Sequence, residues 1–179
     1  MKKITILLVL ALLSISFLGS AQSYEHTVTG SGGLFGQGYG GEFSVNYNIS
    51  EISFIQGAFF VSIDTYKEAI DVPYSNYNAV LSYFTTLWST PRRFYVLSGG
   101  IGPVVGYESI NNGQQEIDEV VSIEGGESRV LFGAAGSLEF DILVSEQYSL
   151  IFRTTQFYHI NSEIGNFTNF SGAGIRYYF

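Results

Sequence analysis

Charged residues in the C-terminal half of the chain are the first candidates for chemistry. When the segments around them are taken as extended strands, with side chains alternating between two faces, these charges fall on the same face. Carboxylates and guanidinium groups on one face can form ion pairs, and buried charges need such partners. A gate or an ion path is one interpretation, but a structural network filling a narrow barrel is the one we favour. The cluster comprises Glu139, Asp141, Arg153 and Arg176, and we expect Glu42 and Asp64 to extend it.

A second group, near the end of the chain, carries the residue types of a hydrolase. His159, Ser162 and Glu163 are close in sequence, and the chain has two histidines and no cysteine. Hydrolysis would require the serine hydroxyl to meet an imidazole that a third group orients. Nothing in the spacing of these residues fixes that geometry. We therefore expect no catalytic residues, and a lipid-modifying hydrolase that uses His159 remains the enzyme alternative.

The segment 109–127 is unusually acidic. No basic residue lies between Arg93 and Arg129. A calcium site needs several oxygens converging on one ion, and the spacing matches no ion-binding loop. We interpret the segment as a solvated surface loop, with docking of a protein partner as the alternative. Its acidic residues are Glu116, Asp118, Glu119, Glu124 and Glu127.

Closely spaced glycines in "GLFGQGYGG" (33–41) raise the possibility of a phosphate-binding loop. Such a loop needs a helix directly after it, because the positive end of the helix dipole holds the phosphate. The following residues, "EFSVNYN", have the pattern of a strand instead. We interpret the glycines as a tight hairpin, and we expect no cofactor, no metal ion and no small-molecule substrate.

The first residues predict export from the cytoplasm. Two lysines, an apolar stretch from Ile4 to Leu18 and the small residues up to Ala21 make a signal peptide, cleaved after Ala21. An uncleaved membrane anchor is the alternative, although the apolar stretch is short for a spanning helix. Residues 22–179 then form one domain. The formal net charge of the whole chain is −8, so we expect no direct binding to nucleic acid.

The elements that must position these residues are strands. Runs of aromatic, β-branched and small residues, bounded by turn residues, predict eight of them. Their length and strict alternation favour an all-β fold, an eight-stranded antiparallel transmembrane β-barrel of outer-membrane type. Short links alternate with the longer links 67–73, 109–127 and 161–165, and the first link, near residues 35–37, is a short exception. This pattern places both chain termini in the periplasm. The predicted strands are 26–34, 38–48, 52–66, 74–89, 92–108, 128–144, 147–160 and 166–179.

Aromatic residues give a further test of this barrel, because aromatic side chains gather at the two membrane boundaries. The alternation places two groups of them outward, one at each end of the strands, and outer-membrane lipid is the expected partner of that face. A soluble barrel of lipocalin type is the alternative, and it would keep its aromatic residues inside. The outward groups are Tyr47, Tyr95, Tyr148, Tyr177 and Phe179 at one end, and Tyr77, Tyr107, Tyr158 and Phe167 at the other.

The chain ends on an alternating strand with a bulky apolar final residue, "SGAGIRYYF". Ile175, Tyr177 and Phe179 share the face that we expect to meet lipid, while Arg176 points inward. The strand would close the barrel against the first strand, because no open edge is tolerated in lipid. We expect these three residues to form the signal that the outer-membrane assembly machinery recognises.

The segments from Tyr95 to Phe179 resemble the conjugal transfer protein TraO family of Bacteroidota conjugative transposons. The counterparts of the family's segments are 106–111, 133–147 and 171–178. Glu139, Arg153 and Arg176 fall where the family tends to place an acid, an arginine and a basic residue. The resemblance implies an outer-membrane part of a conjugative DNA-transfer apparatus, with other apparatus proteins as partners and no catalytic residues. A free-standing small barrel used for adhesion or envelope protection is the rival hypothesis.

Overall fold

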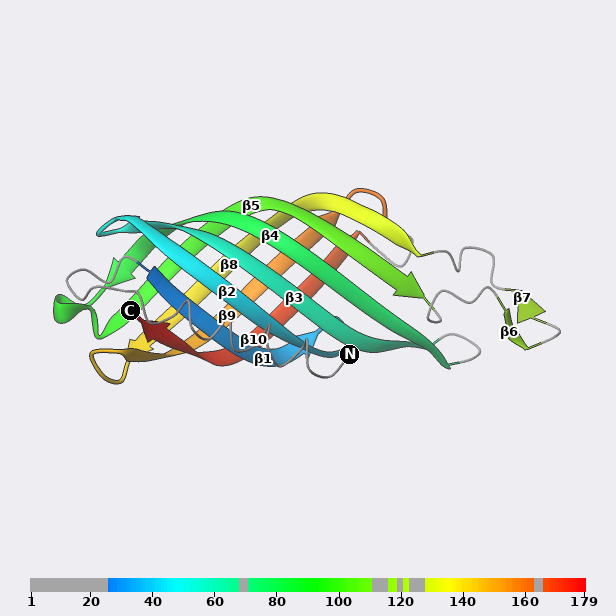
Figure 1. Cartoon of the computed structure of the whole chain (residues 1–179), viewed down its shortest axis with the longest axis horizontal. Helices are drawn as coiled ribbons and strands as arrows, with labels where there is room; N and C mark the ends of the chain where they lie inside the picture. The colour runs from blue at the N-terminus through cyan, green and yellow to red at the C-terminus, as the bar shows by residue number, and fades with distance from the viewer. Residues whose placement is uncertain (1–25, 68–70, 111–115, 119–120, 123–127, 163–165) are drawn as a thin grey trace, which may run out of the picture.

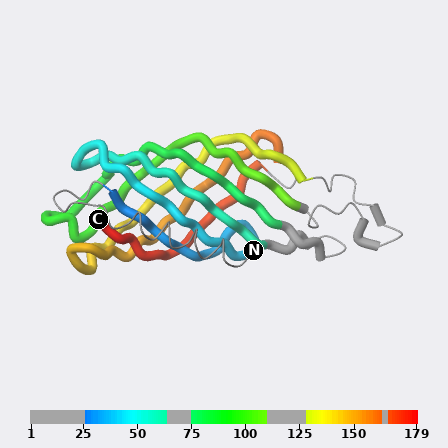
Figure 2. Tube along the Cα trace, viewed as in Figure 1, coloured from blue at the N-terminus to red at the C-terminus, as the bar shows by residue number. Residues whose placement is uncertain are grey.

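The computed structural model describes residues 26–67, 71–110, 116–118, 121–122, 128–162 and 166–179. The predicted signal peptide therefore lies outside the described residues. Eight long strands form the barrel, and Figures 1 and 2 show them winding around a common axis. They are β1 (His26–Phe35), β2 (Gly38–Ser50), β3 (Ser53–Lys67), β4 (Asp71–Ser89), β5 (Tyr95–Ile110), β8 (Arg129–Leu143), β9 (Tyr148–His159) and β10 (Phe167–Tyr178).

The strands form a closed antiparallel barrel in the order β1-β10-β9-β8-β5-β4-β3-β2. Closure comes from β10, which pairs with β1 from Thr27–Tyr178 to Phe35–Phe170. Side chains alternate between buried and exposed along each strand, most regularly in β9. This period of two follows from strand geometry, which sends successive side chains to opposite faces. All eight predicted strands are present, with ends that differ by a few residues.

The two ends of the barrel differ in their connections. The links β2–β3, β4–β5 and β8–β9 lie at one end, together with the start of β1 and the C-terminus (Figure 1). We call this the turn end, and the opposite end the loop end. The expected loop 67–73 at the loop end is wrong in extent, because β3 and β4 stay paired as far as Lys67 and Asp71. Only residues 68–70 separate these strands, and they lie outside the described residues.

The link between β4 and β5 also differs from the prediction, which started a strand at residue 92. A short 3-10 helix, η1 (Pro91–Arg93), occupies this place. Proline favours the first helical position because its φ is fixed and its missing N–H needs no partner there. The N–H of Tyr95 donates to Thr90 Oγ1 at 3.0 Å, and the strand resumes at Tyr95. Among the described residues, no helix is both long and apolar enough to span a membrane.

A two-stranded sheet in the acidic segment was not predicted. β6 (Glu116–Asp118) pairs with β7 (Val121–Ser122), and neither joins the barrel sheet. Of the candidate docking residues, Glu119, Glu124 and Glu127 lie outside the described residues, as do the side chains of Glu116 and Asp118.

The outer wall of the barrel carries the two predicted groups of aromatic side chains. Those near the turn end include the contacting rings of Tyr148 and Tyr177, whose centroids lie 5.2 Å apart. Near the loop end, Tyr158 and Phe167 have ring centroids 5.0 Å apart. These two aromatic belts consist of Tyr47, Tyr95, Tyr148, Tyr177 and Phe179 at the turn end, and Tyr77, Tyr107, Tyr158 and Phe167 at the loop end.

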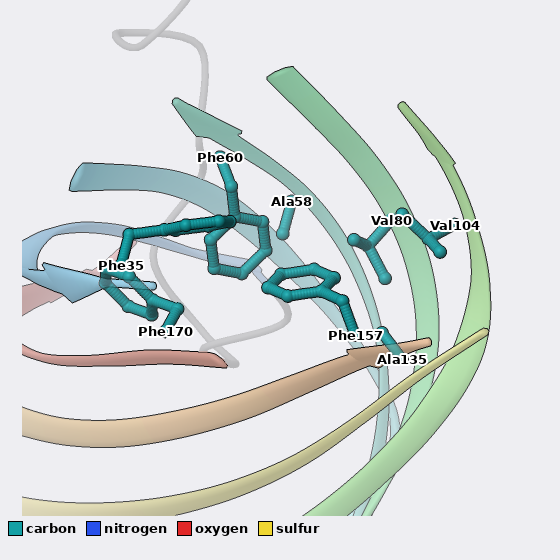
Figure 3. Close-up of a cluster of buried hydrophobic side chains, with 8 residues drawn as sticks. All are labelled: Phe35, Ala58, Phe60, Val80, Val104, Ala135, Phe157 and Phe170. Carbon is teal, nitrogen blue, oxygen red and sulfur yellow. The ribbon is translucent and has the colours of Figure 1, made fainter. Parts of the chain in front are cut away.

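Further aromatic residues fill the interior, which the sequence did not predict. Figure 3 shows their rings converging across the barrel from different strands. The ring centroids of Phe35 and Phe157 lie 5.4 Å apart, and those of Phe60 and Phe157 lie 5.1 Å apart. Apolar rings packed in this way leave no polar path between them. We call this cluster the aromatic layer; it comprises Phe35, Ala58, Phe60, Val80, Val104, Ala135, Phe157 and Phe170.

A charged network in the barrel interior as the candidate functional site

Five ionisable side chains meet inside the barrel, closer to the turn end than the aromatic layer. On β9, for example, Arg153 precedes Phe157 by two inward positions. The alternation of four strands brings these side chains to one place, and all five are buried. The charged network comprises Glu42 of β2, Glu139 and Asp141 of β8, Arg153 of β9 and Arg176 of β10.

Arg153 lies between two carboxylates. Its Nη1 pairs with Glu42 and its Nη2 pairs with Glu139. Nη1 also donates to Gln56 Oε1 at 3.0 Å. β2 and β8 are not neighbours in the sheet, so this guanidinium joins opposite parts of the wall across the interior. A planar guanidinium with five donors suits such a bridge better than a lysine would.

Arg176 extends the network toward the turn end. Its Nη1 lies 2.7 Å from Glu139 Oε1 and 3.0 Å from Asp141 Oδ2, and its Nε donates to Thr29 Oγ1 at 3.0 Å. The hydroxyl of Tyr178 donates to Asp141 Oδ2 at 2.8 Å. Glu139 thus serves both arginines, and the buried carboxylates receive the hydrogen bonds that they need away from water.

Two stacked phenylalanines support the arginines from the opposite wall. The rings of Phe54 and Phe84 are nearly parallel, with centroids 4.8 Å apart. The guanidinium carbon of Arg153 lies 5.7 Å from the centre of the Phe84 ring, and that of Arg176 lies 5.9 Å from the centre of the Phe54 ring. These distances suit cation–π attraction. The inward Gly100 makes room for the stack, because a Cβ there would lie 2.5 Å from the Phe84 ring.

The structure brings together all four predicted members of the cluster and confirms Glu42 as a fifth. The side chain of the other expected member, Asp64, lies outside the described residues. Sequence reasoning did not name Gln56, Thr29 or Tyr178 as partners. All three face inward by the same alternation, but an inward polar residue on its own does not reveal which charge it will meet.

A cavity of about 590 Å³ opens between the network and the turn end. Glu139, Asp141 and Arg176 form part of its wall, and Glu51 and Glu146 of the turns contribute further carboxylates. Carboxylates outnumber guanidinium groups along its wall, where Arg93 is the other basic residue. The cavity therefore ends at the network, and most of the charged side chains along its wall are acidic.

The candidate hydrolase residues have different partners from those that catalysis would require. His159 is buried, and its Nε2 lies 3.0 Å from Asn78 Oδ1. The hydroxyl of Ser162 donates to Glu108 Oε2 at 3.0 Å instead of to the imidazole. Glu163 lies outside the described residues. Among the described residues, no group of three or more histidine or acidic side chains is placed to hold a metal ion.

Comparison with protein families identifies the chain. The model of the family described as conjugative transposon protein TraO matches residues 27–179. The chain belongs to the TraO family. The match extends the expected resemblance from the C-terminal half to all eight strands of the barrel. None of the curated proteins matches the chain significantly.

Solved structures of outer-membrane proteins share the fold. The chain aligns with a major outer membrane protein of Thermus thermophilus at a TM-score of 0.67 and 12% identity, covering 86% of this chain and 98% of that one. The N-terminal β-barrel domain of Pseudomonas aeruginosa OprF gives 0.59 and 10%, with 86% and 96% covered. Neisserial surface protein A gives 0.59 and 12%, with 89% and 100% covered. This TraO-family chain therefore has the fold of a small outer-membrane barrel.

Proposed function

We propose that this chain is a non-enzymatic anchor in the outer membrane for a conjugative DNA-transfer apparatus. The filled interior of a TraO-family barrel is the observation that carries the proposal. DNA and folded proteins are far wider than the space within an eight-stranded barrel, whose interior is just filled by side chains. The chain belongs to a family of conjugative transposon proteins, and the barrel supplies a stable position in the membrane.

Two layers support a structural role for the interior. Arg153 connects Glu42 and Glu139 across the barrel, and the aromatic layer closes the interior further toward the loop end. A gate would need side chains that can separate, but separating Arg153 from its carboxylates would leave buried charges without partners. The network is therefore proposed as a brace of the barrel wall.

We infer that both termini face the periplasm after cleavage behind Ala21. The start of β1 and Phe179 lie together at the turn end, and short turns are typical of the periplasmic end of such barrels. This orientation presents the cavity beside the network to the periplasm, and it presents the loop end, where β5 ends at Ile110 and β8 begins at Arg129, to the outside. Apparatus proteins in the periplasm would meet the turn end.

Deletion of the gene from its mobile element tests the proposed function. We expect transfer frequency in mating assays to fall and to recover when the full-length chain is supplied in trans. Outer-membrane integrity, measured by sensitivity to detergent, should stay unchanged, since an apparatus component has no general envelope role. Unchanged transfer would overturn the proposal and favour the free-standing barrel for adhesion or envelope protection.

The hydrolase alternative has a separate test. In the proposed non-enzymatic role, His159→Ala leaves lipid turnover in the outer membrane at the level of the unmodified protein. Turnover that depends on the full chain and disappears in His159→Ala would show an enzyme. Asn78→Ala is a matched control, because it removes the described partner of His159 and keeps the imidazole.

A further inference from the structure

One sector of the outer wall differs from the rest in its chemistry. Between the two aromatic belts, the outward residues of β1, β2, β3, β5 and β8 are apolar residues or glycines in the described strands, and β4 adds only the partly exposed Thr85. β9 and β10 depart from this pattern with four exposed polar side chains. We call this group the polar strip: Thr154, Gln156, Asn169 and Ser171.

The strip lies within the membrane depth and not at a membrane boundary. Its residues form two consecutive pairs across β9 and β10, with an aromatic pair on the loop-end side and an apolar pair on the turn-end side. Polar groups at this depth face hydrocarbon, which offers them no hydrogen bonds. From the loop end, the outward pairs are Tyr158–Phe167, Gln156–Asn169, Thr154–Ser171 and Phe152–Ala173.

Hydrogen bonds within the strip satisfy some of its polar groups and leave others without a partner. Ser171 Oγ lies 3.0 Å from Asn169 Oδ1 and from Thr154 Oγ1, and Asn169 Nδ2 donates to Thr154 Oγ1 at 3.2 Å. Gln156 Nε2 donates to the carbonyl of Thr168 at 3.0 Å. Within the described part of the chain, Gln156 Oε1 accepts no hydrogen bond. An amide acceptor at this depth therefore points outward without a donor.

The residues beside the strip are smaller than the fold requires. Gly136 on β8 is the register partner of Gln156, and a Cβ at Gly136 would meet no atom within 4 Å. Gly32 on β1 is the partner of Ala173, and a Cβ there would meet only the Gly40 carbonyl, at 3.9 Å. Packing within the barrel thus explains neither glycine. Small residues beside polar ones are typical of interfaces between proteins in membranes, where they allow close approach.

We propose that the polar strip is an interface with a second copy of this chain, related by a two-fold axis along the membrane normal. Rotation about that axis keeps every residue at its own depth, so each strip meets another strip at the same level. Side-chain amides carry both donors and acceptors, so the surface is complementary to itself. The strip holds no charged side chain, so pairing two copies brings no like charges together. This inference rests on the barrel fold and not on the transfer role.

Cysteine cross-linking in the intact outer membrane tests the interface, because the chain has no cysteine of its own. The full-length chain is expressed in a host that lacks other transfer proteins, with Asn169→Cys, Ser171→Cys or Ala173→Cys in turn. Ala79→Cys on β4 is the matched control, since Ala79 is also an exposed alanine of the outer wall, four strands away from β10. Mild oxidation is followed by gel electrophoresis without reducing agent.

We expect at least one strip variant to give a band of about twice the monomer mass, as a two-fold dimer requires, while Ala79→Cys stays monomeric. Absence of dimer from all three strip variants would overturn the proposal and leave the strip facing lipid. Equal dimer from Ala79→Cys would also overturn it, because random collisions would then explain the product. A cross-link to a different host protein would also overturn the proposal, because the strip would then bind that protein and not a second copy of this chain.

Enlarging the small residues gives an independent test. Gly136→Leu should reduce cross-linking through Ala173→Cys several-fold, because the added side chain holds the two walls apart. Gly57→Leu on β3 is the control, since a Cβ at Gly57 also meets no atom within 4 Å and β3 lies four strands from β9. Heat-modifiable migration confirms that both variants are folded. Equal cross-linking in the two variants would contradict the proposal.

Discussion

Arg153 illustrates how one residue unites opposite parts of the wall. It comes from β9 and contacts Glu42 of β2 and Glu139 of β8, which do not pair with each other in the sheet. Alternation along the strands predicted that these charges face the same interior, and the structure confirms it. The third contact, with Gln56, could not be predicted, because many neutral polar residues face inward and only their height in the closed barrel selects the partner.

Arg153→Met should therefore lower the free energy of unfolding by about 3–5 kcal/mol, because it leaves the buried Glu42 carboxylate without a cationic partner and removes one of the two partners of Glu139. Urea unfolding in lipid vesicles, followed by the fluorescence of the single tryptophan, Trp88, measures this change. Arg93→Met, at an exposed turn position, is the control and should stay near the unmodified value. Adding Glu42→Gln and Glu139→Gln to Arg153→Met should restore much of the loss. A loss equal to that of the control would show that the network does not brace the barrel.

Glycine positions give a second prediction at the residue scale. Gly100→Ala should destabilise the barrel by about 1–3 kcal/mol, because its Cβ would lie 2.5 Å from the ring of Phe84 beneath Arg153. Gly57→Ala serves as the control, since a Cβ there is also free of contacts within 4 Å. The same vesicle unfolding assay compares them. Similar stability of the two variants would mean that the stacked phenylalanines are not tightly packed.

At the scale of elements, the sequence determined the strands better than their connections. The eight strands were predictable because apolar and polar residues alternate over long runs, and closure then fixes their order. The helix η1 and the pair β6–β7 were not, since short turns depend on local backbone choices that alternation does not encode. The aromatic layer was also missed. Phenylalanine occurs on both faces of the strands, so its presence alone does not show that inward residues such as Phe60 gather in one layer.

The end of β10 carries the predicted assembly signal. Phe179 lies beyond the strand, and its N–H donates to the His26 carbonyl of β1 at 3.2 Å. Phe179→Asp should greatly reduce the folded fraction in the outer membrane, because a charge replaces an aromatic ring in the terminal assembly signal with Ile175 and Tyr177. Heat-modifiable migration measures that fraction. Shortening the loop 109–127 is the control and should be tolerated far better. If both changes were tolerated equally well, the proposed assembly signal would be wrong.

For the whole molecule, two layers of different chemistry close the interior, and this gives a prediction about conductance. The purified, folded chain should show no steady current steps in planar lipid bilayers, since ions would have to pass both the charged network and the aromatic layer. Phe35→Ala with Phe157→Ala removes rings that lie 5.4 Å apart in the aromatic layer, yet the current should remain at baseline because the buried ion pairs persist. Discrete, reproducible steps from the unmodified chain would exclude a sealed anchor, whereas steps only from the double variant would show that the aromatic layer alone forms the seal.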